Sequence, residues 1–386
     1  MNYSFHFLSF FFYVPALFWL LCAFILGIIA SSFLIPCIVS CAIVLPLILI
    51  QAWFIYIKKI DYDYAWVILI GIFFSLGAYH YEKTIGDYKR NTALIAGKFM
   101  CLRGTITDIN SLDHPRFKQL TSIAITEART EDNSLIKEIT GKSIYVYSAK
   151  KSHFTVDDQI ELPDVRINQP KKPSIQLYLQ KENTIGTLVR DLNAEKLLHR
   201  PTSSIKRWLY EKKTLLFSRL RSRMSAKTFT FFSAFFLGNR KINKNENDAL
   251  KQSCKYWGIS HYLARSGLHL VIFIMVWEYM LRFIPLAFIA KQLILLLLTI
   301  MYFLLTWNSI SFFRAFLTFL CYRFFLLTSM QSHTLHAIIF VSLIVLLFNP
   351  SQLFFLDFQL SFGITFLLSW INQLKMREKR RVQQKP

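Results

Sequence analysis

Long apolar runs constrain the fold of this 386-residue chain more than any other feature. A helix that crosses the hydrocarbon core of a bilayer needs about 20 mostly apolar residues. Such runs recur near residues 10–30, 36–57, 64–80, 267–284, 286–306, 310–329, 334–349 and 353–371. With 54% hydrophobic residues and 37 Phe, the composition is also more apolar than that of ordinary globular domains. The sequence therefore predicts a polytopic α-helical membrane protein with about eight spans.

Basic residues between the runs predict which segments face the cytoplasm. Lys58 and Lys59 lie between the second and third runs, and residues 375–386 carry six basic residues against Glu378. Under the positive-inside rule both segments are cytoplasmic. No Lys or Arg precedes the first run, so we expect a retained membrane helix rather than a cleaved signal peptide. The N-terminus is then cytoplasmic, and three spans place the following segment on the outer face.

Residues 85–200 have a different pattern, which predicts a small all-β domain. Stretches rich in Ile, Val, Thr and Tyr alternate with turn residues such as Asp157-Asp158. The predicted strands are residues 99–109, 118–127, 142–148, 158–167 and 183–189. Five strands suit an inserted OB-like barrel, a fold that commonly binds single-stranded nucleic acid. The segment has 18 basic and 14 acidic residues, so binding to other proteins remains an equal alternative.

A compact polar cluster leads directly into the fourth apolar run. His261, Arg265 and His269 recur every four residues, so on a helix they would share one face. Such a stripe is positively polarised, and the planar guanidinium of Arg265 suits phosphate groups. Ser266 and Gly267 would let backbones approach closely or interrupt a helix that lines a cavity. Hydrogen-bonded packing is the alternative role for each histidine.

Short motifs surround this cluster. Residues 236–240 read Phe-Leu-Gly-Asn-Arg, and residues 260–269 contain Ser-His, Leu-Ala and Ser-Gly-Leu-His in that order. Further on, residues 347–350 read Leu-Phe-Asn-Pro and residues 358–362 read Phe-Gln-Leu-Ser-Phe. Together they resemble the "LLG-(D/N)-R", "SHLLA-SGLH" and "L-(D/N)-P … FQLSF" elements of the ComEC-type competence proteins. That family passes incoming single-stranded DNA across the bacterial inner membrane.

The resemblance implies a DNA-uptake component of natural competence that forms part of a channel for single-stranded DNA. It implies a multi-pass protein of the bacterial inner (cytoplasmic) membrane with an extracytoplasmic β domain. The candidates for the DNA pathway are His261, Arg265, Ser266, Gly267, His269 and Arg314. The residues of the structural motifs are Gly238, Arg240, Asn349, Pro350, Asp357, Gln359 and Ser361.

Three positions depart from the family pattern. The family usually has an apolar residue where Arg265 stands, and it has small residues where Val271 and Asp357 stand. Asp357, Ser361 and Thr365 are spaced by four residues and would form a polar stripe on the last helix. A carboxylate at such a position is either part of a functional site or the partner of a nearby Arg.

Basic charge is concentrated after the β segment. Residues 203–227 contain eight Lys or Arg and only Glu211, which gives +7 of the net +22. A polyanion such as DNA is attracted by such a segment through release of counterions. The segment also carries Trp208, Leu216 and Leu220, so attachment to anionic lipid is the alternative. Both roles can coexist.

No segment has the spacing of a catalytic site. Full-length relatives carry a metallo-β-lactamase-type domain with a His-x-His-x-Asp-His cluster, and the sequence contains neither this cluster nor a Walker-type loop. His333 and His336 have no carboxylate beside them. We therefore expect no enzymatic activity and no metal or other cofactor. Besides single-stranded DNA and membrane lipids, the expected partners are a separate chain with the missing channel helices and nuclease domain, and a cytoplasmic ATP-driven DNA-pulling protein.

The expected organisation has five parts. The chain ends soon after residue 362, so we expect a shortened channel domain, completed by another chain or left as a gene remnant. The rival interpretation is a non-catalytic structural or vestigial membrane protein whose β domain binds other proteins. The parts are membrane helices at 1–84, the OB-like domain at 85–200, a basic interfacial helix at 201–227, the truncated channel domain at 228–374 and a basic cytoplasmic tail at 375–386.

Overall fold

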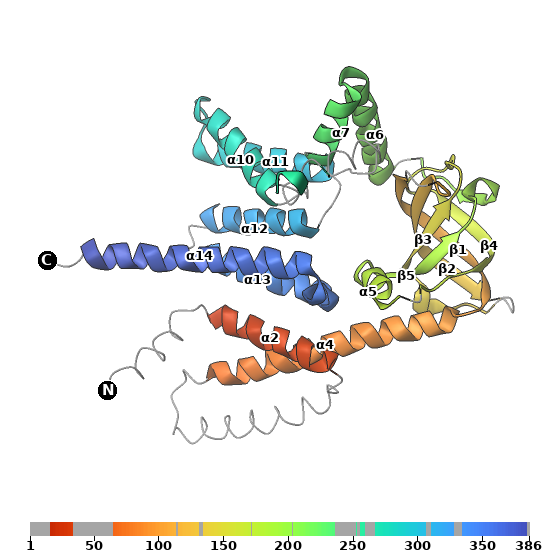
Figure 1. Ribbon diagram of the computed structural model, residues 1–386, viewed down its shortest axis with the longest axis horizontal. Coiled ribbons are helices and arrows are strands. Elements are labelled where there is room, and N and C mark those ends of the chain that lie inside the picture. The colour runs from red at the N-terminus through yellow and green to blue at the C-terminus, as the bar shows by residue number, and fades with distance from the viewer. Residues whose placement is uncertain are drawn as a thin grey trace. The chain divides into compact units, whose positions relative to one another are not determined.

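The chain folds into two compact units, shown in Figure 1. The first unit joins Met1–Asp87 to Phe313–Pro386, and the second comprises Tyr88–Phe312. The computed structural model describes residues 16–33, 65–112, 115–130, 134–170, 172–202, 204–235, 252, 255–258, 267–305, 310–327 and 334–383.

A six-stranded mixed sheet forms the centre of the second unit. Its strand order is β5-β3-β2-β1-β4-β6. Neighbouring strands are antiparallel except β3 and β5, which run parallel. An isolated bridge between Asn168 and Thr187 links the segment after β4 to β5. The strands are β1 (Phe99–Ser111), β2 (Gln119–Thr130), β3 (Ser143–Ser148), β4 (Gln159–Arg166), β5 (Thr184–Val189) and β6 (Lys196–His199).

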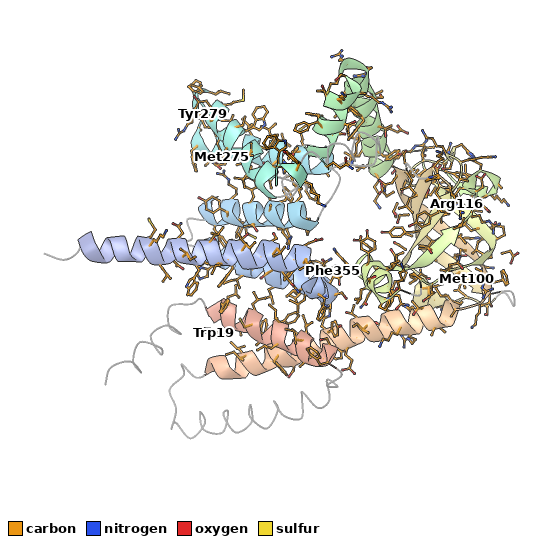
Figure 2. All side chains as sticks on the ribbon, in the orientation of Figure 1. Trp19, Met100, Arg116, Met275, Tyr279 and Phe355 are labelled. Atoms are coloured by element: carbon orange, nitrogen blue, oxygen red, sulfur yellow. The ribbon has the colours of Figure 1, made fainter. Side chains whose placement is uncertain are left out.

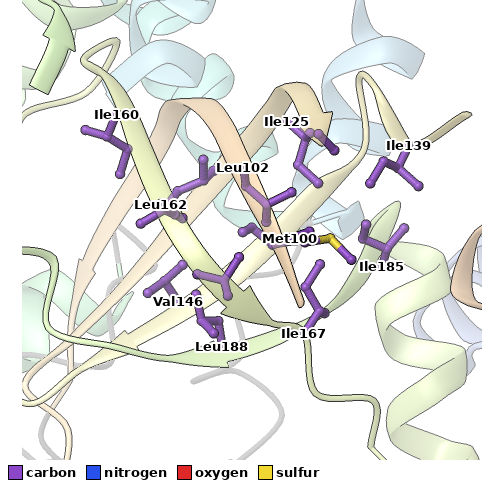
Figure 3. Close-up of a cluster of buried hydrophobic side chains, with 14 of the residues drawn as sticks. Met100, Leu102, Ile125, Ile139, Val146, Ile160, Leu162, Ile167, Ile185 and Leu188 are labelled. Carbon is purple, nitrogen blue, oxygen red and sulfur yellow. The ribbon is translucent and has the colours of Figure 1, made fainter. Parts of the chain in front are cut away.

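The core of this sheet follows from alternation along the strands. Buried and partly exposed residues alternate through most of β1, β2 and β3, as expected where one face of a strand packs inward. Figure 3 shows Met100 and Leu102 of β1 beside Ile160 and Leu162 of β4 in one apolar interior. Each of these four side chains is at most 1% exposed, so β1 and β4 are firmly fixed to each other.

Helices surround the sheet and continue the chain after it. The short helices are η2 (Lys137–Ile139), α5 (Pro173–Lys181) and η3 (Leu192–Ala194), and α5 packs beside β5. The chain then forms α6 (Ile205–Arg223) and α7 (Ala226–Phe235), which contact each other. Further along, α10 (Gly267–Arg282) packs on α11 (Phe288–Leu305) through stacked rings of Phe273 and Tyr302, 4.4 Å apart.

The first unit is helical. It contains α2 (Ala16–Ser32), α12 (Ile310–Leu327), α13 (Thr334–Phe348), η4 (Pro350–Phe354) and α14 (Leu356–Gln383), and α4 (Ala65–Ile95) continues into the second unit. Gly27 of α2 and Gly77 of α4 allow a close helix crossing. A Cβ at Gly27 would lie 2.0 Å from the Phe74 oxygen, and one at Gly77 would lie 2.2 Å from the Phe24 oxygen. These two positions therefore exclude any side chain.

The predicted fold class, a polytopic membrane protein with eight spans and an OB-like barrel, is wrong. Five of the described apolar helices are shorter than the runs that predicted them, among them α10, α2 and α13 with 16, 17 and 15 residues. The helices α4 and α14 are longer, with 31 and 28 residues, but the second half of each carries charged residues. The helices α11 and α12 reach 18 residues each, or about 27 Å at 1.5 Å per residue. No helix in the described ranges combines the length and the apolar character needed to cross a bilayer.

The residue ranges predicted for the strands agree with the structure better than the predicted fold class does. The strands β1 to β5 lie within three residues of the predicted bounds, but the sheet is mixed and gains β6 as a sixth strand. The predicted basic helix at 201–227 is interrupted, because α6 ends at Arg223 and α7 begins at Ala226. The apolar run at 36–57 lies outside the described residues.

Candidate functional site

The basic helix α6 is well formed by its own sequence. The hydroxyl of Ser204 caps its N-terminus and accepts a hydrogen bond from the Arg207 amide at 3.2 Å. Arg221 and Arg223 lie in the last turn, where cations favour the negative end of the helix dipole. The helix contains seven Lys or Arg, one Glu, and neither Gly nor Pro in its interior.

One face of α6 combines apolar and basic side chains that are open to solvent. No residue of the helix is buried, and Figure 2 draws its side chains along the whole length. At 100° per residue, the members of this face fall within about 80° of one another. Ile205, Trp208 and Leu215 are 84%, 57% and 43% exposed. We call this face the α6 stripe, and it consists of Ile205, Trp208, Lys212, Leu215, Arg219 and Arg223, all exposed.

Lys212 and Trp208 contact each other within the α6 stripe. The Lys212 ammonium lies 5.9 Å from the centre of the Trp208 ring. This distance is at the edge of the range for a cation–π interaction. The pair places a large aromatic surface beside a cation on an accessible helix, which is an arrangement that can stack a base and contact a phosphate.

The opposite face of α6 is anchored to the sheet through the buried carboxylate of Asp158. Asp158 has a fully buried side chain, and Arg200 donates to it twice, from Nε to Oδ1 at 2.9 Å and from Nη2 to Oδ2 at 2.7 Å. The Arg207 guanidinium of α6 lies 3.9 Å from Oδ1. The Thr155 amide also donates to Oδ2, at 2.8 Å. The bidentate pair fixes the orientation of Arg200, which precedes α6, and Arg207 adds a longer contact from the first turn of the helix.

A neighbouring aspartate holds the start of the helix. Asp157 adopts a positive φ of 73° at the turn before β4, and its carboxylate accepts a hydrogen bond from the Ser204 hydroxyl at 2.6 Å. Tyr210, one turn into α6, has a raised pKa, mainly because of burial and to a smaller extent because of the Asp108 carboxylate at β1. Two consecutive aspartates therefore connect the sheet to the first turns of α6.

The electrostatics of Asp158 reflect these contacts. Burial alone would raise the pKa of its carboxyl group, because the charged form loses hydration. The hydrogen bonds from Arg200 and Thr155 more than offset this effect, and the pKa is lowered from its usual value of 3.8. The carboxylate is therefore ionised at neutral pH and binds the two arginines as an ion.

A cavity opens beside this anchor. It has a volume of about 680 Å³ and lies between the segment Arg200–Ser204 and the first two turns of α6. Arg200, Arg207, Trp208 and Glu211 line it. The space is open to solvent, so a strand bound along the α6 stripe can reach its lining residues.

Several of the predicted site residues lie outside the described residues. They are His261, Arg265 and Ser266 of the proposed stripe, and Gly238 and Arg240 of the first motif. Of the remaining cluster, Gly267 begins α10, and His269 follows in its first turn with 5% exposure.

The last motif forms a local structure around the start of α14. The side-chain Oδ1 of Asn349 accepts a hydrogen bond from the Ser351 amide at 3.1 Å and so caps η4, and Pro350 occupies its first position. Gln359 donates to the Leu353 oxygen at 2.9 Å. Asp357 lies in the first turn of α14, and the Ser361 oxygen accepts from the Thr365 hydroxyl at 2.5 Å.

Arg314 lies against the rings of the same motif. Its guanidinium carbon is 4.9 Å from the ring centre of Phe362 and 5.9 Å from that of Phe358. Burial lowers the pKa of Arg314 to about 10, and the Asp357 carboxylate opposes this effect. The structure therefore brings Arg314 together with the Phe-Gln-Leu-Ser-Phe motif, a pairing that the sequence did not predict.

The sequence also did not identify the aspartate anchor. From the sequence, Asp157-Asp158 are predicted only to form a turn, and Arg200 and Arg207 contribute only to the positive charge. Two adjacent aspartates directly before a strand, followed about 40 residues later by a basic segment, were the available signal. Within the described ranges, no group of three His, Cys, Asp or Glu residues could hold a metal ion.

Comparison with known proteins gives one match. Residues 236–386 match the model of a family described as Competence protein. This match confirms the resemblance to the ComEC-type competence proteins over that part of the chain, and it indicates a role in competence and DNA uptake. It also supports association with a membrane. Neither a curated protein nor a solved structure matches the chain.

Proposed function

We propose that this chain, whose residues 236–386 belong to the Competence protein family, acts in DNA uptake by binding single-stranded DNA on the α6 stripe. The observation that carries the proposal is an exposed basic and aromatic helix held rigidly on a folded domain. Polyanion binding gains free energy when protein cations displace the counterions condensed on the phosphates, and three of the seven cations of α6, Lys212, Arg219 and Arg223, lie on the stripe. The proposal includes no catalytic step.

The aromatic member of the stripe favours single strands. Trp208 is 57% exposed, so its ring can stack on a base. Bases in a duplex are already stacked on their neighbours, whereas those of a single strand are open to an aromatic side chain. The binding free energy would combine stacking on Trp208 with phosphate contacts to Lys212, Arg219 and Arg223.

The sheet offers a poorer surface for phosphates. Arg103 donates to Glu161 at 2.8 Å and to Glu127 at 3.3 Å, and Arg129 lies 3.6 Å from Glu127. These side chains line a second cavity, of about 370 Å³, together with Asp164. Because carboxylates already neutralise its arginines, this surface attracts a polyanion less than α6 does.

Anionic lipid is the second candidate ligand for the α6 stripe. Ile205 and Leu215 are 84% and 43% exposed, and a helix with such apolar residues beside cations can lie in a lipid headgroup region.

We propose that the protein works at the bacterial inner membrane. There it would work with a separate chain that supplies channel helices and a nuclease, and with a cytoplasmic ATP-driven protein that pulls DNA.

Charge reversal separates these candidates. The variant Arg219→Glu/Arg223→Glu should weaken binding of the full-length chain, in non-ionic detergent, to a 20-nucleotide oligo-dT by at least about tenfold, since both phosphate contacts are lost and replaced by repulsion. Lys150→Glu/Lys151→Glu, with exposed lysines of the β domain, changes the net charge equally and should have a smaller effect.

Vesicles with and without phosphatidylglycerol complete the test. Loss of vesicle binding without loss of DNA binding in the Arg219→Glu/Arg223→Glu variant would assign the α6 stripe to lipid. In a competent host, the same variant should lower transformation frequency at an unchanged protein level. Normal transformation and normal DNA affinity would contradict the proposed function.

A further inference from the structure

Arg314 has more buried polar atoms without a hydrogen bond than any other described residue. The residue is 2% exposed, and its Nε, Nη1 and Nη2 atoms all lack an acceptor within the described parts of the chain. A guanidinium has five N–H donors, and removing them from water without replacement acceptors is strongly unfavourable. In the observed state the charged guanidinium of Arg314 therefore lies in an apolar environment, and its N–H donors have no acceptor among the described residues.

The neighbours of Arg314 compensate for only part of the lost hydration. Phe362 and Phe358 offer ring faces at 4.9 and 5.9 Å, but a phenyl ring accepts no conventional hydrogen bond. The Asp357 carboxylate attracts Arg314 electrostatically, although its residue is exposed in the first turn of α14. The rings thus hold the guanidinium in place and leave its donors unused.

Arg323 of the same helix provides a contrast. It is also buried, at 8% exposure, and its guanidinium carbon lies 5.0 Å from the Phe319 ring centre and 5.9 Å from that of Tyr322. Only its Nε atom is buried without a hydrogen bond. Aromatic packing is therefore common to both arginines, whereas the complete lack of acceptors distinguishes Arg314.

We propose that Arg314 is a binding site for a phosphate group, supplied by the backbone of the DNA strand. This inference deepens the proposed function and rests on it. A phosphate accepts two parallel hydrogen bonds from a guanidinium, so it would satisfy the donors that the apolar environment leaves unused. Because Arg314 is 2% exposed, phosphate enters through a transient opening between α12 and α14 and is enclosed again in the bound state, which is more stable than the phosphate-free state. Asp357 opposes the approach of the anion, and Asp357→Asn should therefore strengthen binding.

Hydrogen exchange of the α14 peptide Leu356–Phe366 measures occupation of the site locally. With the full-length chain in non-ionic detergent, inorganic phosphate at ten times its Kd should slow exchange of this peptide by about tenfold. Arg314→Met should abolish the slowing. Arg314→Lys, which keeps the charge but not the planar fork, should weaken phosphate binding. The matched control Arg323→Met should retain the response.

Thermal unfolding gives an independent sign. Arg314→Met replaces an unsatisfied charge by an apolar side chain of similar length, so it should raise the melting temperature in the absence of ligand. Arg323→Met should not raise it. A lower melting temperature for Arg314→Met, together with an unchanged exchange response to phosphate, would overturn the proposal and leave Arg314 as a packing residue.

Oligo-dT distinguishes this inference from the proposed function. In the Arg219→Glu/Arg223→Glu background, oligo-dT should still slow exchange of Leu356–Phe366, and adding Arg314→Met should abolish that effect. If oligo-dT binds the α6 stripe but does not affect α14 in any variant, the Arg314 site is wrong and the proposed function stands. If phosphate acts through Arg314 but no DNA binds the chain, the DNA assignment fails and the anion site stands.

Discussion

The contacts of Arg200 in the β unit and of Arg314 in the helical unit differ in whether a buried charge has hydrogen-bond partners. Arg200 has a side chain that is 38% exposed, and it donates twice to the fully buried Asp158 carboxylate. Arg314 is 2% exposed and lies against aromatic rings, and its guanidinium has no hydrogen-bond acceptor among the residues that the structure describes. In the β unit the buried charge is satisfied and fixes a helix, whereas in the helical unit the buried charge is unsatisfied. Removing one partner of a buried ion pair is strongly destabilising, so the contacts of Asp158 have an architectural role.

The largest effect is expected at the glycine crossing of the helical unit. Gly77→Leu places a side chain where even a Cβ would lie 2.2 Å from the Phe24 oxygen, and a backbone oxygen cannot rotate away. We expect α2 and α4 to separate and the first unit to lose about 3 kcal/mol or more of stability. Urea unfolding, followed by hydrogen exchange of each unit, measures this. Gly86→Leu on the same helix has open space and should be mild.

The next effect concerns the anchor of α6. Asp158→Asn removes the charge that binds Arg200 and Arg207, and we expect the β unit to lose about 3 kcal/mol of stability. Hydrogen exchange of α6 should accelerate in the same variant. Asp164→Asn, which changes an exposed carboxylate of β4, is the control and should change little. Equal effects of the two substitutions would remove the anchoring role of Asp158.

A smaller effect is expected for the stacking residue. Trp208→Ala should weaken oligo-dT binding by about 1–3 kcal/mol, the usual contribution of one stacked base. Trp208→Phe keeps an aromatic face and should retain most of the affinity. Because Trp208 is 57% exposed, neither variant should change the melting temperature appreciably. Equal affinities for Trp208→Ala and the unmodified chain would exclude stacking.

The smallest effect is the pH dependence of the anchor. The folded-state pKa of Asp158 lies below its usual value of 3.8, so its contribution is complete above that value and is lost as the pH falls through the folded-state pKa. The stability difference between the unmodified chain and Asp158→Asn should therefore be constant from neutral pH down to this region, and should shrink below it. A difference that shrinks above pH 5 would indicate a raised pKa instead.

The local sequence pattern predicted the residue ranges of strands and helices well, but it predicted the fold class poorly. Alternation along residues 99–109 and 142–148 is a property of neighbouring residues, and it gave β1 and β3 closely. Apolar runs likewise marked the positions of α10 and α13. The length of an apolar run did not predict the length of the helix. Helix ends depend on capping and on contacts with neighbouring segments, and α13 has only 15 residues.

The site depends on contacts that are distant in sequence. Asp158 and Arg200 are 42 positions apart, and no periodicity links them. Arg314 was chosen from the sequence as a pathway residue, but its contact with Phe358 and Phe362 joins two helices and could not be predicted from spacing. The basic character of α6 was visible in composition, whereas the face that it exposes became clear only once Arg207 was seen to point toward the sheet.

Photo-cross-linking tests most directly whether the α6 stripe receives the DNA strand. An oligo-dT containing bromodeoxyuridine, irradiated with the full-length chain and mapped by peptide mass spectrometry, should form its main cross-link at Trp208. Trp208→Ala and Arg219→Glu/Arg223→Glu should each reduce this adduct, and Lys150→Glu/Lys151→Glu should not. A main cross-link on the sheet around Arg103, unaffected by the α6 variants, would contradict the account.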